Sequence, residues 1–163
     1  MKDSTNRAGY AHRQDGRAGF SFVESLIILC IVTVIEGATI LIADPWNRFQ
    51  EARNVQRISN VNFITNGIYM NIVDHDGYFV CAAGPLPTAK ATIMASKDGY
   101  DIAPCLVPKY FSTVPYDPGA KDSYYKSKRD YNTGYAVLQN SATGRIIVIA
   151  PEAELGQSIQ VER

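Results

Sequence analysis

The sequence predicts an α+β fold in which one long N-terminal helix carries a small C-terminal antiparallel sheet on its second half. Three patterns predict it: an apolar run over residues 20–43, apolar residues at helical spacing over 58–72, and two strand-like runs at 131–139 and 145–150. A chain of 163 residues has about the length of one domain. Its sixteen basic and sixteen acidic side chains balance, so we expect no direct binding to nucleic acid.

The apolar run over 20–43 contains two charged residues among twenty-four, Glu24 and Glu36. As a helix it would be about 36 Å long, enough to cross a hydrocarbon core of about 30 Å. The preceding residues 1–19 carry four basic and two acidic side chains, which favours a cytoplasmic N-terminus and an outer C-terminal domain. The run therefore predicts a transmembrane helix and a single-pass cytoplasmic membrane protein.

Glu24 is the unusual residue of this run, because a carboxylate at the bilayer centre costs at least about 2.5 kcal/mol. It lies four residues after Phe20, about 6 Å along a helix axis, so an α-amine freed on Phe20 of a neighbouring subunit would lie at nearly the same depth. The alternative is a carboxylate at the span edge that reaches water. For Glu36, about 24 Å from Phe20, we favour such an edge position over a contact between subunits.

The segment Gly19–Ile27, between a basic leader and a long apolar run, resembles the cleavage and methylation motif of type IV prepilins and type II secretion pseudopilins. The resemblance implies cleavage between Gly19 and Phe20 by a membrane-embedded prepilin peptidase, and N-methylation of Phe20. It also implies that Glu24 sets the register of subunits in a filament. The mature chain would have 144 residues, with twelve basic and fourteen acidic side chains.

The pilin-like domain organisation implied by this resemblance is a leader (1–19), a transmembrane or filament-core helix (20–43) and an exposed domain that includes the second half of the helix (44–163). The implied function is a structural subunit of a type IV pilus or type II secretion pseudopilus, at the cell surface or in the periplasm. Implied partners are identical subunits, minor pilins or pseudopilins, the prepilin peptidase, an inner-membrane assembly platform, and membrane lipid before assembly. The alternative is a single-pass anchored binding or enzymatic domain that does not polymerise.

The chain departs from the family pattern in its apolar run. Thr33 stands in place of a frequent helix glycine, Leu41 in place of the usual proline, and Glu36 is a second acid. Gly37 and Pro45 lie nearby and disfavour a helix interior by about 1 and 3 kcal/mol. We therefore expect any melting of the helix on assembly between these two residues.

Beyond Asp44-Pro45, which could kink the helix or cap a new segment, residues 46–73 contain no proline and one glycine, so the helix is expected to continue. Its end is predicted at Asp74–Tyr78, with Gly77 as a left-handed cap. The apolar stripe that should face the sheet consists of Ile58, Val61, Ile64, Ile68 and Ile72. The runs Tyr131–Gln139 and Arg145–Ala150 predict an antiparallel hairpin.

Residues 81–130 contain six prolines and predict turns and loops. Within them, Lys109–Pro118 resembles the segment with a Tyr followed by Pro-x-Asp-Pro that precedes the sheet in major pseudopilins. As surfaces for contact with neighbours we expect this whole stretch together with several tyrosines. These are Tyr116, Tyr124, Tyr125, Tyr131 and Tyr135, of which the last two are better explained as half-buried sheet residues.

The three cysteines divide into Cys30 in the apolar run and a pair outside it, Cys81 and Cys105. In an oxidising compartment this pair could form a disulfide that closes a loop of about 25 residues, worth about 3 kcal/mol. Cys30 is most simply a small apolar residue of the run.

The side chains suited to catalysis are few, so we expect no enzyme. His12 would leave with the leader, and His75 alone remains. The turn Asp74-His75-Asp76 is better explained as a solvated helix end than as a metal site, because three adjacent residues do not converge easily.

Calcium is the one cofactor considered, because the resemblance extends to major pseudopilins, which bind it near the sheet loop. Asp117, Asp122 and Asp130 are the candidate ligands. Four nearby cations oppose a divalent ion: Lys121, Lys126, Lys128 and Arg129.

Overall fold

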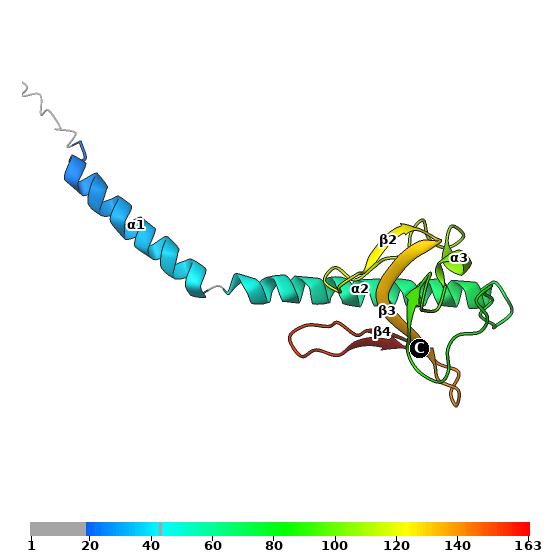
Figure 1. The fold of residues 1–163 in the computed structure, drawn as a ribbon. Helices are drawn as coiled ribbons and strands as arrows, with labels where there is room; N and C mark the ends of the chain where they lie inside the picture. The colour runs from blue at the N-terminus through cyan, green and yellow to red at the C-terminus, as the bar shows by residue number, and fades with distance from the viewer. Residues whose placement is uncertain (1–18, 43) are drawn as a thin grey trace, which may run out of the picture. The chain divides into compact units, whose positions relative to one another are not determined.

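The computed structural model describes residues 19–42 and 44–163 (Figure 1). Residues 1–18, most of the predicted leader with His12, lie outside the described residues, as does Ala43. The chain divides into two compact units, residues 1–43 and 44–163. The described helices are α1 (Phe22–Ile42), α2 (Pro45–Val73) and α3 (Ala103–Leu106). The described strands are β1 (Thr92–Ala95), β2 (Tyr124–Ser127), β3 (Asp130–Gln139), β4 (Ile146–Ala150) and β5 (Ile159–Glu162).

The predicted single long helix is wrong, because α1 ends at Ile42 and α2 begins at Pro45. Asp44, just before α2, has a φ angle of 38° in the left-handed region. Proline disfavours the helical conformation in the residue before it and has no N–H to donate to a preceding turn. At the first position of a new helix that missing N–H is no loss, so Pro45 starts α2 instead of continuing α1.

Of the helices in the described ranges, none is at once long and apolar enough to cross a membrane. The predicted transmembrane helix over 20–43 is therefore corrected, and with it the single-pass membrane location and the pilin-like class built on a long apolar helix. Glu24 and Glu36 leave only the eleven residues Ser25–Ile35 uncharged between them. Such a stretch is about 16 Å long as a helix, about half of the hydrocarbon thickness. The described residues instead form a helix-rich N-terminal part and a C-terminal antiparallel sheet.

The sheet of the second unit has five strands within the described residues, all paired antiparallel. β3 pairs with β1 along one side and with β4 and β2, one after the other, along the other side, and β5 forms the edge beyond β4. The predicted hairpin is confirmed, since Ala136 of β3 is opposite Ile149 of β4 and Gln139 is opposite Ile146. β4 and β5 contact α2, which the sheet covers on one face (Figure 1).

The core lies between this face of α2 and the sheet. Val61, Ile64 and Ile68 are fully buried, as the stripe predicted. Ile72 is only partly buried, and Ile58 is 47% exposed beside the segment 157–161. Successive helix residues are rotated by about 100° around the helix axis. Ile58 therefore points well to one side of Ile64 and Ile68 and lies at the margin of the stripe.

Gly67 is the single glycine of α2, and it permits a close contact with the loop after α3. A Cβ at this position would overlap Cζ and Cε2 of Phe111. The Phe111 ring also stacks on Phe63, with centroids 4.1 Å apart. The glycine therefore lets the tip of the Phe111 ring approach the helix closely.

The end of α2 agrees with the predicted cap. The helix ends at Val73, and Gly77 has a φ angle of 96°. Its N–H donates to the carbonyl oxygen of Ile72 at 3.0 Å, which satisfies a carbonyl left open at the helix end.

Candidate functional site

The predicted processing residues lie at the start of the described chain. Gly19 and Phe20 are exposed and precede the first turn of α1. Glu24 lies in that first turn and is also exposed. A carboxylate there is favoured by the positive end of the helix dipole, which gives Glu24 a role inside its own chain besides any contact between subunits. The peptide bond between Gly19 and Phe20 is accessible for cleavage.

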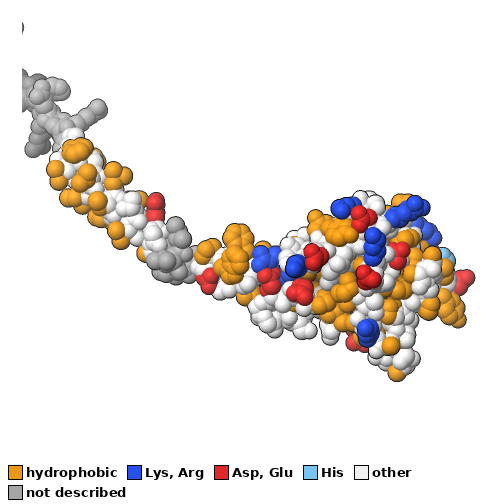
Figure 2. Space-filling model, in the orientation of Figure 1, with side chains coloured by type: hydrophobic (Ala, Val, Ile, Leu, Met, Phe, Trp, Pro, Cys, Tyr) orange, Lys and Arg blue, Asp and Glu red, His pale blue; other side chains and the backbone are white. Residues whose placement is uncertain are grey.

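Helix α1 exposes apolar side chains on all sides between Phe22 and Ile35, and Figure 2 shows those on the face in view. The exposed large ones within α1 are Phe22, Val23, Leu26, Ile27, Ile28, Leu29, Ile31, Val32, Val34 and Ile35. A helix that is apolar on all sides is normally buried, and an exposed apolar surface of this extent marks an interaction site. Helix α1 is therefore a candidate interaction surface.

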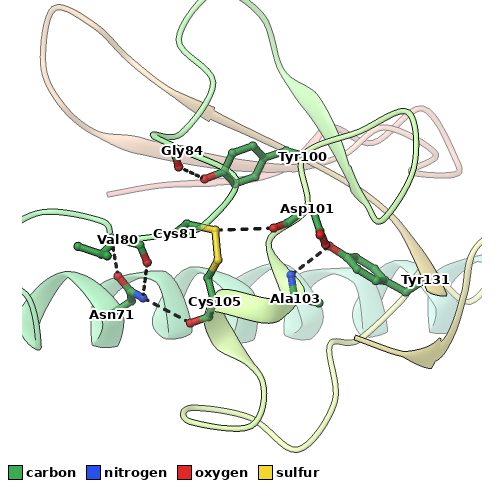
Figure 3. Close-up of a disulfide and its surroundings, with 9 residues drawn as sticks. All are labelled: Asn71, Val80, Cys81, Gly84, Tyr100, Asp101, Ala103, Cys105 and Tyr131. Carbon is green, nitrogen blue, oxygen red and sulfur yellow. Dashed lines mark hydrogen bonds between the residues drawn. A yellow bond between two sulfur atoms is a disulfide. The ribbon is translucent and has the colours of Figure 1, made fainter. Parts of the chain in front are cut away.

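A disulfide joins Cys81 and Cys105, the two cysteines that the compartment and parity argument paired. Asn71 of α2, itself buried, holds both ends of the closed loop (Figure 3). Its Nδ2 donates to the carbonyl oxygens of Val80 at 3.0 Å and Cys105 at 3.4 Å, and its Oδ1 accepts from the N–H of Val80 at 2.9 Å. Disulfides persist in oxidising compartments, so the bond indicates such an environment for this unit.

Two tyrosine hydroxyl groups form hydrogen bonds with residues of the same loop, one from Tyr100 in the loop itself and one from Tyr131 in β3 (Figure 3). The hydroxyl of Tyr100 donates to the carbonyl oxygen of Gly84 at 2.6 Å, and burial raises the pKa of Tyr100 to about 12. The Tyr131 hydroxyl donates to Oδ1 of Asp101 at 2.8 Å and accepts from the N–H of Ala103 at 3.0 Å. The loop thus has a fixed shape on the surface of the unit.

Asp117, within the Pro-x-Asp-Pro segment, forms a buried ion pair with Arg57 of α2. Nε of Arg57 donates to Oδ2 of Asp117 at 2.7 Å and Nη2 donates to Oδ1 at 2.9 Å. The backbone N–H groups of Gly119 and Ala120 donate to Oδ1 as well, each at 2.8 Å. This bidentate pair fastens the loop before β2 to the helix.

The ion pair extends to the loop between β4 and β5 through Glu154. Nη1 of Arg57 donates to Oε2 of Glu154 at 2.6 Å, and Arg53 pairs with both oxygens of the same carboxylate. The hydrogen bond from Arg53, and next that from Arg57, lowers the pKa of Glu154 to about 2. Burial lowers the pKa of Arg57, but its hydrogen bonds to Asp117 and Glu154 outweigh burial and leave the pKa raised. Glu154, Arg53 and Arg57 are therefore ionised across the neutral range, and their ion pairs join the loop between β4 and β5 to α2.

The candidate calcium ligands are not brought together. Asp117 is committed to Arg57, while Asp130 accepts from the hydroxyl of Tyr124 at 2.7 Å and lies 3.5 Å from Nζ of Lys126. Asp122 is exposed in a turn with a φ angle of 64°. Across residues 19–42 and 44–163 no group of three or more His, Cys, Asp or Glu side chains is arranged to hold a metal ion.

The polar side chains of the turn after α2 bond to other residues of the same unit. Asp74 pairs with Lys109 at 2.8 Å and accepts from the hydroxyl of Tyr110 at 3.0 Å, and these two bonds lower the pKa of Asp74. Nδ1 of His75 lies 2.6 Å from the carbonyl oxygen of Asn71. These contacts are those of a helix end.

The structure confirms that Tyr131 and Tyr135 are sheet residues, but it buries them fully where half-burial was predicted. Tyr131 and Tyr135 are buried in β3, and Tyr124 and Tyr125 of β2 are partly buried. Tyr116 is exposed beside a groove formed by α2 and the loop before β2. Of the five, Tyr116 is the best placed for outside contacts.

Comparison of the chain with protein-family models, with curated proteins and with solved structures found no match. The motif resemblance at Gly19–Ile27 therefore rests on the residues themselves. Sequence reasoning did not find the roles of Arg57 and Asn71. A signal for Arg57 was present, because it precedes Val61 by one helical turn and so lies on the apolar face.

Proposed function

We propose that this chain is a structural subunit of a type IV pilus or type II secretion pseudopilus, cleaved after Gly19, N-methylated on Phe20 and polymerised through α1. The observation that carries this function is the exposed apolar surface of α1 from Phe22 to Ile35, which begins within the prepilin-like motif Gly19–Ile27. The other compact unit, residues 44–163, is the part that the filament displays.

Burial of α1 against other copies supplies the driving force. Each Val, Leu, Ile or Phe side chain that becomes fully buried contributes about 1.5–3 kcal/mol. Ten large apolar side chains of α1 are available, so partial burial of the set exceeds the cost of immobilising a subunit, which is about 4–15 kcal/mol. Identical copies suit this helix because an apolar surface on all sides must be covered on all sides.

Glu24 gives the assembly its register. A carboxylate moved into an apolar contact is costly when unpaired, and an opposite charge at the right position compensates it. The freed amine of Phe20 on a neighbouring copy is such a charge, because cleavage creates it four residues from Glu24 in sequence. Subunits out of register would leave the carboxylate without this partner.

The experiment is to co-express the chain with a prepilin peptidase and to image the product by electron microscopy. We expect filaments from the wild type and none from Ile31→Lys, which places a charge in the middle of the apolar surface of α1. Tyr78→Lys is the matched control, since Tyr78 is exposed in the other unit. Particles that stay monomeric in the wild type would contradict polymerisation and favour a domain that works as a single copy.

A further inference from the structure

A groove of about 520 Å³ opens between α2 and the loop before β2. Its lining comes from three segments of the chain: Gln56 and Asn60 of α2, residues 113–116 with Pro118 of the loop, and Tyr125 of β2. Small-molecule sites in proteins have volumes of about 300–1,000 Å³, so the groove has a suitable size. Among the described residues that line it, none is an Asp, Glu, Lys, Arg or His. The groove is therefore suited to an uncharged ligand.

The loop that forms one wall of this groove has a fixed position. Asp117, in the middle of the loop, is buried and paired with Arg57 of α2. The N–H of Asp117 donates to the carbonyl oxygen of Thr133 in β3 at 2.8 Å, and its carbonyl oxygen accepts from the hydroxyl of Ser123 at 2.6 Å. A ligand therefore meets a wall that is already ordered, and binding does not incur the entropy cost of ordering it.

Two tyrosine rings supply aromatic surface in the groove. Tyr116 is 47% exposed, and Tyr125 is partly buried. The ring of Tyr125 is supported from inside the sheet by the ring of Tyr131, with the two centroids 6.1 Å apart. Each ring combines an apolar face with a polar hydroxyl, so a ligand that has both kinds of surface fits beside it.

Hydrogen-bonding groups that remain available surround the two rings. Asn60 uses its amide hydrogens within the protein, at 2.9 Å to the hydroxyl oxygen of Tyr135 and at 3.3 Å to the carbonyl oxygen of Tyr116. Its Oδ1 is left as an acceptor for a ligand. Within the described parts of the chain, the side chains of Gln56 and Thr113 make no hydrogen bond to another residue. The groove thus offers donors and acceptors together.

We propose that this groove binds a neutral carbohydrate. A sugar has C–H groups that pack on an aromatic ring and hydroxyl groups that both donate and accept, so it uses both features of the lining. The proposal concerns residues 44–163 and does not rest on polymerisation.

A proline-rich peptide is the main competitor, because such peptides bind in aromatic-lined grooves. Proline has no N–H, so this ligand would bring acceptors and few donors. The amide oxygens of Gln56 and Asn60 would then lose water without gaining a partner, which disfavours the peptide.

The experiment is saturation-transfer difference NMR on the full chain, kept in a detergent that has no sugar headgroup. The neutral probes are glucose, galactose, N-acetylglucosamine, lactose and cellobiose. Sialyllactose is the acidic comparison and decaproline is the peptide comparison. We expect transfer to at least one neutral probe, and no tighter binding of sialyllactose than of lactose. Absence of transfer to every neutral probe, or transfer to decaproline alone, would overturn the proposal.

Substitutions then locate the binding, with affinities measured by titration of the same signal. Tyr116→Ala should weaken binding at least about fivefold through loss of one aromatic surface, and Gln56→Ala about threefold or more through loss of hydrogen bonds. Both side chains are exposed, so both variants should keep the wild-type denaturation midpoint. Tyr78→Ala is the matched control, because Tyr78 is exposed and lines a different groove. Wild-type affinity in Tyr116→Ala and Gln56→Ala, or an equal loss in Tyr78→Ala, would contradict this site.

Discussion

Replacing Asp117 with alanine is expected to lower the free energy of unfolding by about 3–5 kcal/mol, because it leaves a buried guanidinium without its main partner. The side chains of Arg57 and Asp117 are 1% and 0% exposed. Alanine removes two charge-assisted hydrogen bonds to Arg57 and the single oxygen, Oδ1, that accepts from the N–H groups of both Gly119 and Ala120. Nη1 of Arg57 keeps its bond to Glu154, so the lower half of that range is expected.

The assay is urea denaturation of the full chain, followed by far-ultraviolet circular dichroism. With a slope of about 1–3 kcal/mol per molar urea, the midpoint should fall by at least about 1 M. Glu152→Ala is the control, since Glu152 is exposed and has no positive φ angle, and it should stay within about 0.5 kcal/mol of the wild type. The double substitution Arg57→Met with Asp117→Ala should recover much of the loss, because it removes the stranded charge.

The reasoning would be refuted by a loss below about 1 kcal/mol for Asp117→Ala, within the range of a surface change. A double variant no more stable than Asp117→Ala would contradict the explanation in a different way. The loss would then come from the backbone hydrogen bonds of the loop, and the buried charge would be unimportant.

Gly67→Ala should destabilise the domain by about 1–3 kcal/mol, because the new Cβ overlaps the Phe111 ring, and an unchanged denaturation midpoint would contradict that contact. Glu24→Ala should be cleaved normally but yield few filaments by electron microscopy, and wild-type piliation would refute its register role. The folded-state pKa of Glu154, about 2, lies below its ordinary value of 4.5, so its stabilisation is present above pH 4.5 and is lost as the pH falls towards 2. Glu154→Gln should reduce the dependence of the free energy of unfolding on pH between 4.5 and 2, as measured by denaturation. An unchanged pH dependence would refute the role of Glu154 in it.

Local patterns predicted much of the second unit. The hairpin of β3 and β4 follows from alternating apolar residues on either side of a polar turn, and Gly77 marks the end of α2 because only a flexible residue adopts its conformation cheaply. The buried part of the stripe was visible for the same reason, since helical spacing alone places Val61, Ile64 and Ile68 on one face.

The break between α1 and α2 was not resolved by local patterns. Asp44-Pro45 is compatible with a kink or with a new helix, and the choice depends on the left-handed conformation of Asp44. The prediction of one continuous long helix failed at this point. The partners of Arg57 could not be predicted for another reason. Asp117 and Glu154 are 60 and 97 residues away from it in sequence. Such pairs depend on tertiary packing, which spacing along the chain does not contain.

Whether the chain is trimmed before it assembles can be measured directly, by mass spectrometry of the intact protein recovered from filaments. The expected species has 144 residues and begins with N-methylated Phe20. A recovered protein that keeps Met1, or that begins at any other residue, would contradict the filament subunit proposed for this chain.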